Sequence, residues 1–327
     1  MYGIIKKGAD FMKYTVGVDI GGTNTKIGIV DEEGKIVQKE IIKTLSLEGV
    51  DSTLNRIWNT IKELLEKSKI DIEEILGIGM GIPGPVKNKE IVGFFANFPW
   101  EKNINIAKLF KDISGKETKL ENDVNVIALG EAKYGAGKGS SSSVTIAIGT
   151  GIGGGIFVDG KIISGFSGAG GEVGHMKIVR DGLLCGCGQR GCFEAYASAT
   201  GIEREALSRL KVNKQNKLYE KLEGKIEKVE AKDVFDCAKD GDLFSLDIVD
   251  YEAEYLAMGI GNILNIINPE KIILAGGVSL AGDILLDRVK EKLKKYAMGV
   301  TLEGNFSIEI GTLGNDAGIY GASALIG

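Results

Sequence analysis

The sequence predicts an α/β protein built from two similar domains. Three observations support this prediction. A chain of 327 residues is long enough for two domain cores, a glycine-rich segment occurs twice, and amphipathic helix patterns alternate with short apolar strand patterns. The 48 glycines are about twice the usual share of roughly 7%, and they concentrate in short loops that follow predicted strands.

The repeated segment is the strongest of these observations. Residues 20–31 (IGGTNTKIGIVD) align without a gap with residues 148–159 (IGTGIGGGIFVD), at an offset of 128. Each copy follows an apolar strand, and apolar residues alternating with glycine or polar ones predict strand, tight glycine loop and strand. We expect two similar domains that face each other across a cleft, with glycine loops whose N–H groups can bind phosphates. Two ordinary hairpins are the simpler alternative.

Neither loop matches a familiar nucleotide fingerprint. Gly149, Gly151 and Gly154 have the dinucleotide spacing, but the pattern after them predicts a strand where a Rossmann unit requires a helix. No Gly-Lys-Ser/Thr ends either loop, which excludes a Walker A sequence. Asp19 precedes the first loop, and a carboxylate beside backbone donors suits a phosphate that carries Mg²⁺, whereas Ala147 takes that place in the second copy.

Helices and strands outside the repeat complete the α/β pattern. Apolar spacing predicts an amphipathic helix that starts at Asp51 or Ser52 and extends to Leu65. The other expected elements are strands over 75–80 and 271–277 and helices over 247–267 and 282–297, of which the first helix stops before Pro269.

A cluster of histidine and cysteine residues lies between 171 and 194. It contains the single histidine of the chain and three of its four cysteines: His175, Cys185, Cys187 and Cys192. One imidazole and three thiolates are a complete tetrahedral ligand set, so the spacing predicts a structural zinc. Reduced structural cysteines are the alternative, while disulfides rarely persist in a reducing cytoplasm. Cys237 lies far from the cluster in sequence and is expected to be a buried apolar residue.

The segment LEND (120–123) stands at the end of a predicted strand. Asn122 and Asp123 lie where residues 117–120 (ETKL) pass into the helix pattern that begins at Val124. N-capping explains both residue types, because Asn and Asp are preferred caps. Capping and catalysis can coexist, and a carboxylate at this junction could take a proton from a substrate hydroxyl during phosphoryl transfer.

Composition excludes several classes of function. The net charge of −5 and the isoelectric point near 5.3 argue against a nucleic-acid surface. No apolar run approaches the roughly 18 residues of a membrane helix, so we expect no membrane partner. Residues 1–11 lack the apolar core of a signal peptide. We therefore expect a cytoplasmic protein whose first eleven residues are an extension.

Five motifs together resemble the ROK family of sugar kinases and repressors. They are DIGGTNTK (19–26), LEND (120–123), GTGIGGG (149–155), GEVGH (171–175) with CGCGQRGCFE (185–194), and LAGGVS (274–279). They occur in the family's order from about residue 13 to the end of the chain. The resemblance implies two duplicated actin-like (ribonuclease H-like) domains around a central cleft. The small domain would comprise residues 1–120 and 315–327, and the large domain residues 121–314 with the zinc loop.

Within the family the sequence is most similar to bacterial ATP-dependent glucokinases. The resemblance implies Mg²⁺-assisted transfer of phosphate from ATP to glucose, with Asp123 as general base. The implied sugar ligands are Asn97, Asn122, Asp123, Glu172, His175 and Glu194. The implied phosphate-loop residues are Asp19, Gly21, Gly22, Thr23, Thr150, Gly151, Gly153 and Gly154, with Gly276 and Gly277 on the adenosine side. One nitrogen of His175 would bind zinc and the other would face the sugar.

Other functions share parts of this pattern. Kinases for N-acetylglucosamine, N-acetylmannosamine, mannose or fructose have the same motifs. Family repressors carry a helix-turn-helix segment before the first glycine loop, and only eighteen residues precede Asp19 here. An ATP-driven chaperone or filament of the wider superfamily is disfavoured by GEVGH and the cysteine cluster. Relatives of this length lead us to expect a homodimer or a higher homo-oligomer.

Overall fold

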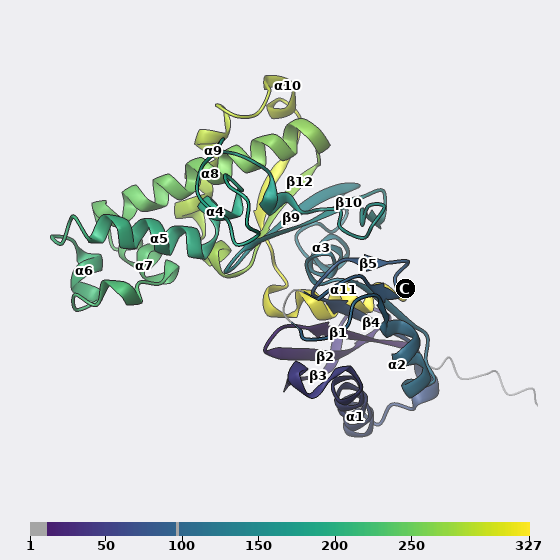
Figure 1. Ribbon diagram of the computed structural model, residues 1–327. Helices are drawn as coiled ribbons and strands as arrows, with labels where there is room; N and C mark the ends of the chain where they lie inside the picture. The colour runs from purple at the N-terminus through teal and green to yellow at the C-terminus, as the bar shows by residue number, and fades with distance from the viewer. Residues whose placement is uncertain (1–11, 96–97) are drawn as a thin grey trace, which may run out of the picture. The chain divides into compact units, whose positions relative to one another are not determined.

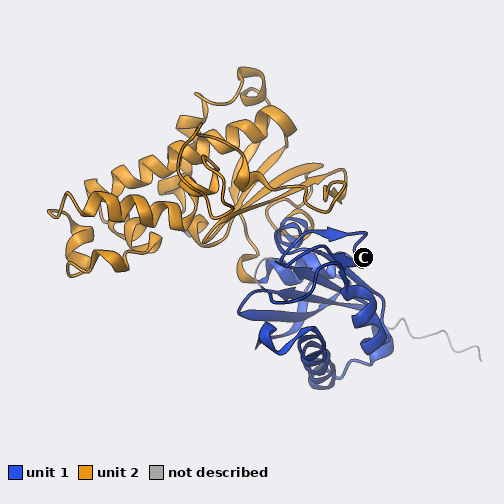
Figure 2. Ribbon diagram, in the orientation of Figure 1, with its two compact units in different colours: residues 1–130, 316–327 blue, residues 131–315 orange. Residues whose placement is uncertain are grey.

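The computed structural model describes residues 12–95 and 98–327 of the chain. Contacts divide the chain into two compact units, unit 1 with residues 1–130 and 316–327 and unit 2 with residues 131–315 (Figure 2). The boundary between the units, at 130/131, falls inside the helix Asp123–Tyr134. The domain boundary expected at 120/121 stays a prediction. Of the helices in the described part of the chain, none combines the length and apolarity needed to cross a bilayer.

Unit 1 is built on a five-stranded mixed sheet. In spatial order its strands are β3 (Ile36–Lys43), β2 (Asn24–Asp31), β1 (Tyr14–Ile20), β4 (Ile75–Ile82) and β8 (Thr118–Asn122) (Figure 1). Strand β1 pairs antiparallel with β2 and parallel with β4, and β8 runs parallel to β4. The carboxyl ends of β1, β4 and β8 therefore lie at the same edge of this sheet.

Unit 2 contains a second sheet of the same design. Its strands, in spatial order, are β11 (Lys161–Ile162), β10 (Ile152–Val158), β9 (Ser142–Ile148), β12 (Lys271–Ala275) and β13 (Ser307–Ile310). The order and the strand directions repeat those of unit 1. Strand β9 begins and ends 128 residues after β1. The predicted duplication of an α/β domain is confirmed.

The two hairpins of the repeat differ by one residue in register. Ile20 pairs with Thr25 across the first hairpin, whereas Ile148 pairs with Ile152 across the second. The second loop is therefore one residue shorter, although the sequences align without a gap. Side chains alternate between the two faces of a strand. Residues of β2 and β10 that align at the offset of 128 therefore point to opposite faces of their sheets.

Helices flank both sheets, and a small sheet is added in unit 1. Unit 1 contains α1 (Val50–Ser68), α2 (Ile106–Ser114), the first part of α3 (Asp123–Tyr134), α11 (Ala317–Ser323), and strands β5 (Val86–Lys87), β6 (Ile91–Val92) and β7 (Ile104–Asn105). Unit 2 contains the rest of α3, α4 (Glu194–Ala197), α5 (Ala199–Leu210), α6 (Lys217–Lys221), α7 (Ala231–Lys239), α8 (Leu243–Ile267), α9 (Asp283–Leu293) and α10 (Gly299–Leu302).

Capping explains where the structure departs from the expected helix starts. Helix α8 begins at Leu243, earlier than expected, because the Asp242 side chain accepts the Ser245 N–H at 3.1 Å. Its end at Ile267, before Pro269, is as predicted. Helix α1 begins at Val50 after Gly49, so the expected caps Asp51 and Ser52 lie inside its first turn.

Helix α11 packs against the unit 1 sheet with almost no side chain between the two backbones. A Cβ atom on Gly79 of β4 would lie 1.7 Å from the carbonyl oxygen of Ala322. A Cβ atom on Gly321 would lie 1.5 Å from the carbonyl oxygen of Val126 in α3. Glycine is required at both positions, and this close packing explains why the end of the chain belongs to unit 1.

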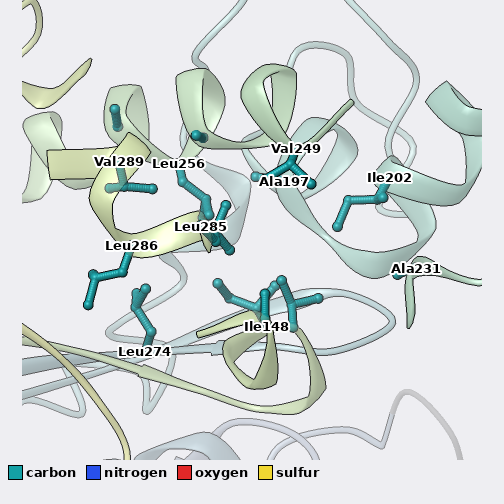
Figure 3. Packing of buried hydrophobic residues seen from close by; sticks show 14 of the residues in the cluster. Ile148, Ala197, Ile202, Ala231, Val249, Leu256, Leu274, Leu285, Leu286 and Val289 are labelled. Carbon is teal, nitrogen blue, oxygen red and sulfur yellow. The ribbon is translucent and has the colours of Figure 1, made fainter. Parts of the chain in front are cut away.

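Each unit has its own apolar core. In unit 2 the core lies between the sheet, which contributes Ile148 and Leu274, and helices that contribute side chains such as Val249, Leu256 and Leu285 (Figure 3). All five are at most 2% exposed. Full burial of such a side chain contributes roughly 1.5–3 kcal/mol each. The core of unit 1 is formed in the same way by strands β1, β2 and β4 with helices α1 and α2.

One carboxyl group interrupts the core of unit 2. Glu252 of α8 is fully buried, and neither of its side-chain oxygens has a hydrogen-bond partner among the described residues. Burial raises the pKa of Glu252 well above its ordinary value, because the charged form is poorly solvated there. The buried carboxyl group of Glu252 therefore lowers the free energy of unfolding, and it lowers it further at a pH where the group must ionise.

We predict that Glu252→Met stabilises the protein, and more at pH 8 than at pH 5. The pKa of Glu252 is higher in the folded than in the unfolded state, so its contribution to stability falls as pH rises above the unfolded-state value. Removing an unpaired buried polar group should add about 1–3 kcal/mol at pH 5, and a larger amount at pH 8.

Urea unfolding of wild type and variant at the two pH values measures this difference. Glu254→Met is the matched control on the same helix, because Glu254 is paired with Lys292 at 3.1 Å and its loss should not stabilise. An equal gain at both pH values, or no gain, would contradict the assignment of a neutral buried Glu252.

Candidate active site

Asp19 lies at the carboxyl end of β1, just before the first glycine loop. It is 9% exposed, and Lys26 across the hairpin places its Nζ 3.3 Å from Asp19 Oδ2. Burial raises the pKa of Asp19, and the charge of Lys26 opposes this shift. A Cβ atom on Gly318 of α11 would lie 2.5 Å from the Asp19 carboxyl carbon, so only glycine fits beside this carboxylate.

The first glycine loop is held by its own backbone and by Thr44. The Gly21 N–H donates to the Asn24 carbonyl at 3.0 Å and closes the hairpin. Thr44 Oγ1 donates to the Gly21 carbonyl at 2.7 Å, and the Thr44 N–H donates to the Thr23 carbonyl at 3.0 Å. Gly22 and Thr23 are exposed. The loop is thus a fixed turn whose tip is accessible to a ligand.

Asn122 and Asp123 lie at the junction of β8 and α3, as predicted. Asn122 Oδ1 accepts the N–H groups of Val124 and Asn125 at 3.0 and 3.2 Å, so Asn122 caps the helix. Its Nδ2 donates to Asp123 Oδ1 at 2.9 Å and to the Gly84 carbonyl at 3.3 Å. One residue therefore caps α3 and orients the neighbouring carboxylate.

The electrostatics of Asp123 connect it to Asp19. Burial raises the pKa of Asp123, a hydrogen bond from the Val124 N–H opposes the shift, and the charge of Asp19 raises the pKa further. The two carboxyl groups are therefore close enough to influence each other. Unit 1 brings Asp19, Asn122 and Asp123 together at the edge where the parallel strands β1, β4 and β8 end.

The second glycine loop borders a cavity of about 760 Å³ in unit 2. The cavity is lined by Gly149 and Thr150 of the loop, by Gly277 and Val278 after β12, and by residues of α5, α7 and the segment before α7. Gly276 has φ +86°, and a Cβ atom there would lie 2.5 Å from the Ile148 carbonyl oxygen. The two predicted nucleotide segments of unit 2 thus meet at this cavity.

Part of the predicted loop has a different structural position. Gly153 and Gly154 lie within β10, where they pair with Ala147 and Ile146. A Cβ atom on Gly154 would lie 2.4 Å from Val173 Cγ2, so this glycine allows the segment before His175 to pack on the strand. Only the first residues of the predicted loop, up to Gly151, form the turn.

Most residues that line the cavity were not predicted from the sequence. These are Ala199, Glu203, Glu227, Lys228, Val229, Glu230, Ala231, Lys232, Phe235, Asp236, Lys239 and Ala281. Charged residues on amphipathic helices are the ordinary signature of a solvated face. No local pattern separates them from other surface positions, so only the packing of α5 and α7 beside the loop reveals them.

The four predicted metal ligands come together in unit 2. One side-chain atom each from His175, Cys185, Cys187 and Cys192 lies within 4.8 Å of the others. The Cys187 and Cys192 sulfurs are 3.7 Å apart, and Cys185 Sγ is 3.8 Å from His175 Nδ1. A tetrahedral zinc with bonds of roughly 2.3 Å places two sulfurs about 3.8 Å apart, so the cluster is compatible with this ion.

The two glutamates that bracket the cluster are in different environments. Glu172 is exposed, with Oε2 4.0 Å from His175 Nε2, the imidazole nitrogen other than the one near Cys185 Sγ. Glu194 Oε2 accepts the Ile152 N–H at 2.9 Å, and its Oε1 lies 3.3 Å from Cys185 Sγ. Unit 2 thus gathers Glu172, His175 and Glu194 around the metal-ligand cluster. Asn97, the remaining predicted sugar ligand, lies outside the described residues.

Comparisons with known proteins agree with these motifs. The glucokinase of Thermotoga maritima is 40% identical over 312 residues, which cover 95% of this chain and 96% of that protein. The glucokinase of Halalkalibacterium halodurans is 38% identical over 323 residues, 96% of this chain and 95% of that protein. The crystal structure of a ROK family glucokinase from Streptomyces griseus in complex with glucose and AMPPNP has a TM-score of 0.79 and 32% identity. It covers 95% of this chain and 98% of that one.

These similarities confirm the actin-like, ribonuclease H-like fold class that the motifs implied. The model of the ROK family matches residues 15–327, nearly the whole chain. The chain therefore belongs to the ROK family.

Proposed function

We propose that this protein is an ATP-dependent hexose kinase that phosphorylates glucose to glucose 6-phosphate. The observation that carries the proposal is its similarity, over 95% of the chain, to glucokinases, with a similar structure solved with glucose and AMPPNP. Features within each unit are consistent with it: unit 1 holds the half-buried Asp123 beside a glycine loop, and unit 2 holds a glycine loop that borders a cavity.

Asp123 is the general base in this proposal. It accepts the proton of the sugar's 6-hydroxyl as that oxygen attacks the terminal phosphorus of ATP. Its raised pKa makes it a stronger base than an ordinary carboxylate, and the hydrogen bond from Asn122 holds it in place. Below that pKa the carboxyl is protonated and cannot accept the proton, so activity should fall on the acid side.

Hydrogen bonds must provide the sugar specificity, because glucose has no charge. Asn122, Glu172, His175, Glu194 and Asn97 are the proposed ligands of the sugar hydroxyls. Carboxylates accept strongly from hydroxyl groups, and amides both donate and accept. His175 Nε2 suits this role because Nδ1 lies on the metal-ligand side, 3.8 Å from the Cys185 sulfur.

The donor nucleotide would use the two glycine loops and the unit 2 cavity. Gly21, Gly22 and Thr23 of the first loop and Thr150 and Gly151 of the second are the proposed phosphate contacts. Gly276 and Gly277 lie on the adenosine side, where the cavity of about 760 Å³ is large enough for a nucleoside. Mg²⁺ would neutralise phosphate charge, and Asp19 is the carboxylate that we propose as its ligand.

We infer that the His–Cys cluster holds a structural zinc. His175 Nδ1 and the thiolates of Cys185, Cys187 and Cys192 fill all four positions of a tetrahedron, which leaves no open site for catalysis. The ion would stiffen the loop that presents Glu172 and His175. None of the four cysteines forms a disulfide, and a cysteine-rich metal site is typical of a reducing compartment, so we also propose a cytoplasmic location. A homo-oligomer without nucleic acid or membrane partners stays a prediction.

A substrate panel tests the function. ADP release with ATP and Mg²⁺ is measured against glucose, mannose, fructose, N-acetylglucosamine and N-acetylmannosamine. We expect kcat/KM for glucose to exceed the others by about tenfold or more, a difference of ~1.4 kcal/mol in transition-state binding. Preference for another sugar would change the substrate but keep the kinase mechanism. No stimulation by any sugar would contradict the kinase assignment.

Replacing Asp123 should slow phosphoryl transfer without weakening glucose binding. We expect Asp123→Asn to lower kcat by about 10²–10⁴-fold, the usual contribution of a general base. Glucose affinity, measured by calorimetry, should stay close to that of wild type, because the amide keeps the shape and part of the hydrogen bonding. Asp112→Asn on the exposed face of α2 is the control and should turn over normally. Near-normal turnover of Asp123→Asn would exclude this role.

Metal content tests the zinc assignment directly. Elemental analysis of the purified protein should find about one zinc per chain. Cys187→Ser removes an exposed ligand and should abolish tight retention of the metal. Cys237→Ala changes a buried cysteine outside the cluster and should leave the content unchanged. A wild-type protein that contains no zinc after metal-replete expression would refute the assignment.

A further inference from the structure

A short segment of unit 2 joins the metal-ligand cluster to the second glycine loop. This connecting segment, residues 192–200, begins at Cys192, contains α4, and ends in the first turn of α5. Three hydrogen bonds link it to the loop at residues 149–152. The Ala199 N–H donates to the Gly149 carbonyl, and Thr200 Oγ1 donates to the Thr150 carbonyl. In the opposite direction, the Ile152 N–H donates to Glu194 Oε2. Each bond is 2.9 Å long.

Two of these bonds determine which way the loop's amide groups point. Both carbonyls, of Gly149 and Thr150, are directed at α5. In a trans peptide the N–H points opposite to the C=O of the same unit. The N–H groups of Thr150 and Gly151 are therefore directed away from α5. Two successive N–H groups on one side of a glycine turn form an anion-binding pair.

The third bond brings the cluster itself into contact with the loop. Glu194 Oε2 accepts the Ile152 N–H, and Oε1 of the same carboxylate lies 3.3 Å from Cys185 Sγ. A Cβ atom on Gly151 would lie 2.3 Å from Glu194 Oε2, so the glycine is what lets this carboxylate approach. One side chain thus touches both a metal ligand and the loop.

Packing anchors the connecting segment to the core of unit 2. Phe193, Ala195, Tyr196, Ala197 and Ser198 are all buried, and Ser198 caps α5 by accepting the Gly201 N–H at 3.1 Å. The Tyr196 ring stacks on Tyr255 of α8, with ring centroids 4.5 Å apart. The segment is anchored to the unit 2 core on one side, and its first residue, Cys192, is the position that a metal would fix.

We propose that the connecting segment couples metal binding at the cluster to binding of the phosphoryl donor at the second glycine loop. Thr200 is a positioning residue in this coupling, because its hydroxyl holds the Thr150 carbonyl and thereby orients the Gly151 N–H. The inference rests on the proposed function, in which this loop binds ATP phosphates. Linkage requires the effect to be reciprocal, so the nucleotide must raise metal affinity by the same factor by which metal raises nucleotide affinity.

Thr200→Val tests the positioning role in the zinc-loaded full chain. Valine keeps the shape of threonine and removes the hydroxyl donor, while Thr200→Ser restores it. We expect Thr200→Val to raise the calorimetric Kd for AMPPNP by about 2–10-fold, the usual effect of losing one hydrogen bond. Thr200→Ser should bind like wild type. Zinc content and glucose affinity should not change in either variant, which separates positioning from general damage.

The coupling itself is measured on wild type without any substitution. Zinc transfer to a chromophoric chelator is followed with and without saturating AMPPNP, and the nucleotide should slow transfer and raise zinc affinity severalfold. The same experiment on Thr200→Val should give a smaller effect.

Two results would overturn the proposal. One is an unchanged AMPPNP Kd in Thr200→Val, and the other is zinc affinity that does not respond to AMPPNP in wild type. If wild type binds AMPPNP and phosphorylates glucose in either case, only the coupling fails. A zinc-loaded wild type that binds no AMPPNP would overturn the proposed function together with this inference.

Discussion

In each unit, the candidate ligand-binding residues depend on the parallel pairing of strands that are far apart in sequence. In unit 1, β1, β4 and β8 run parallel, so their carboxyl ends share one edge of the sheet. Asp19, residues 83–85 after β4, and the pair of Asn122 and Asp123 lie at those three ends. In unit 2, β9 and β12 run parallel in the same way, and the second glycine loop and Gly276 follow them. Open α/β sheets bind ligands at this edge because short loops and helix N-termini collect there.

Close backbone packing keeps that edge in register. Helix α11 lies against β4 and α3 at distances that only glycine allows, with Gly318 beside Asp19. The end of the chain therefore completes the surroundings of a carboxylate near its beginning. A larger side chain at these positions would move the helix, and the burial that raises the pKa of Asp19 would change with it. In the core of unit 2, Glu252 is a buried carboxyl without a hydrogen-bond partner. Nothing among the described residues explains its presence there.

The second glycine loop forms hydrogen bonds both with helix α5 and with Glu194. The carbonyls of Gly149 and Thr150 accept hydrogen bonds from α5, and the Ile152 N–H donates to Glu194. The N–H groups of Thr150 and Gly151 are therefore directed away from α5. The one-residue difference in register between the two hairpins gives each loop its own geometry. In the first loop Thr44, which follows β3, holds the carbonyls, and in the second loop the helix that follows the metal-ligand cluster does so.

The sequence by itself determined the elements whose signals are local. The apolar strand at 75–80, the His–Cys spacing and the cap at Asn122 each depend on residues close together in the chain, and the repeat at an offset of 128 is a match between two such local patterns. Tertiary structure alone decided which distant residues meet. The cavity lining from α5 and α7, the contact of Glu194 with Ile152, and the burial of Glu252 come from packing between elements. Charged residues on a helix look the same in sequence whether they face solvent or a cavity, because periodicity records a face and not its neighbour.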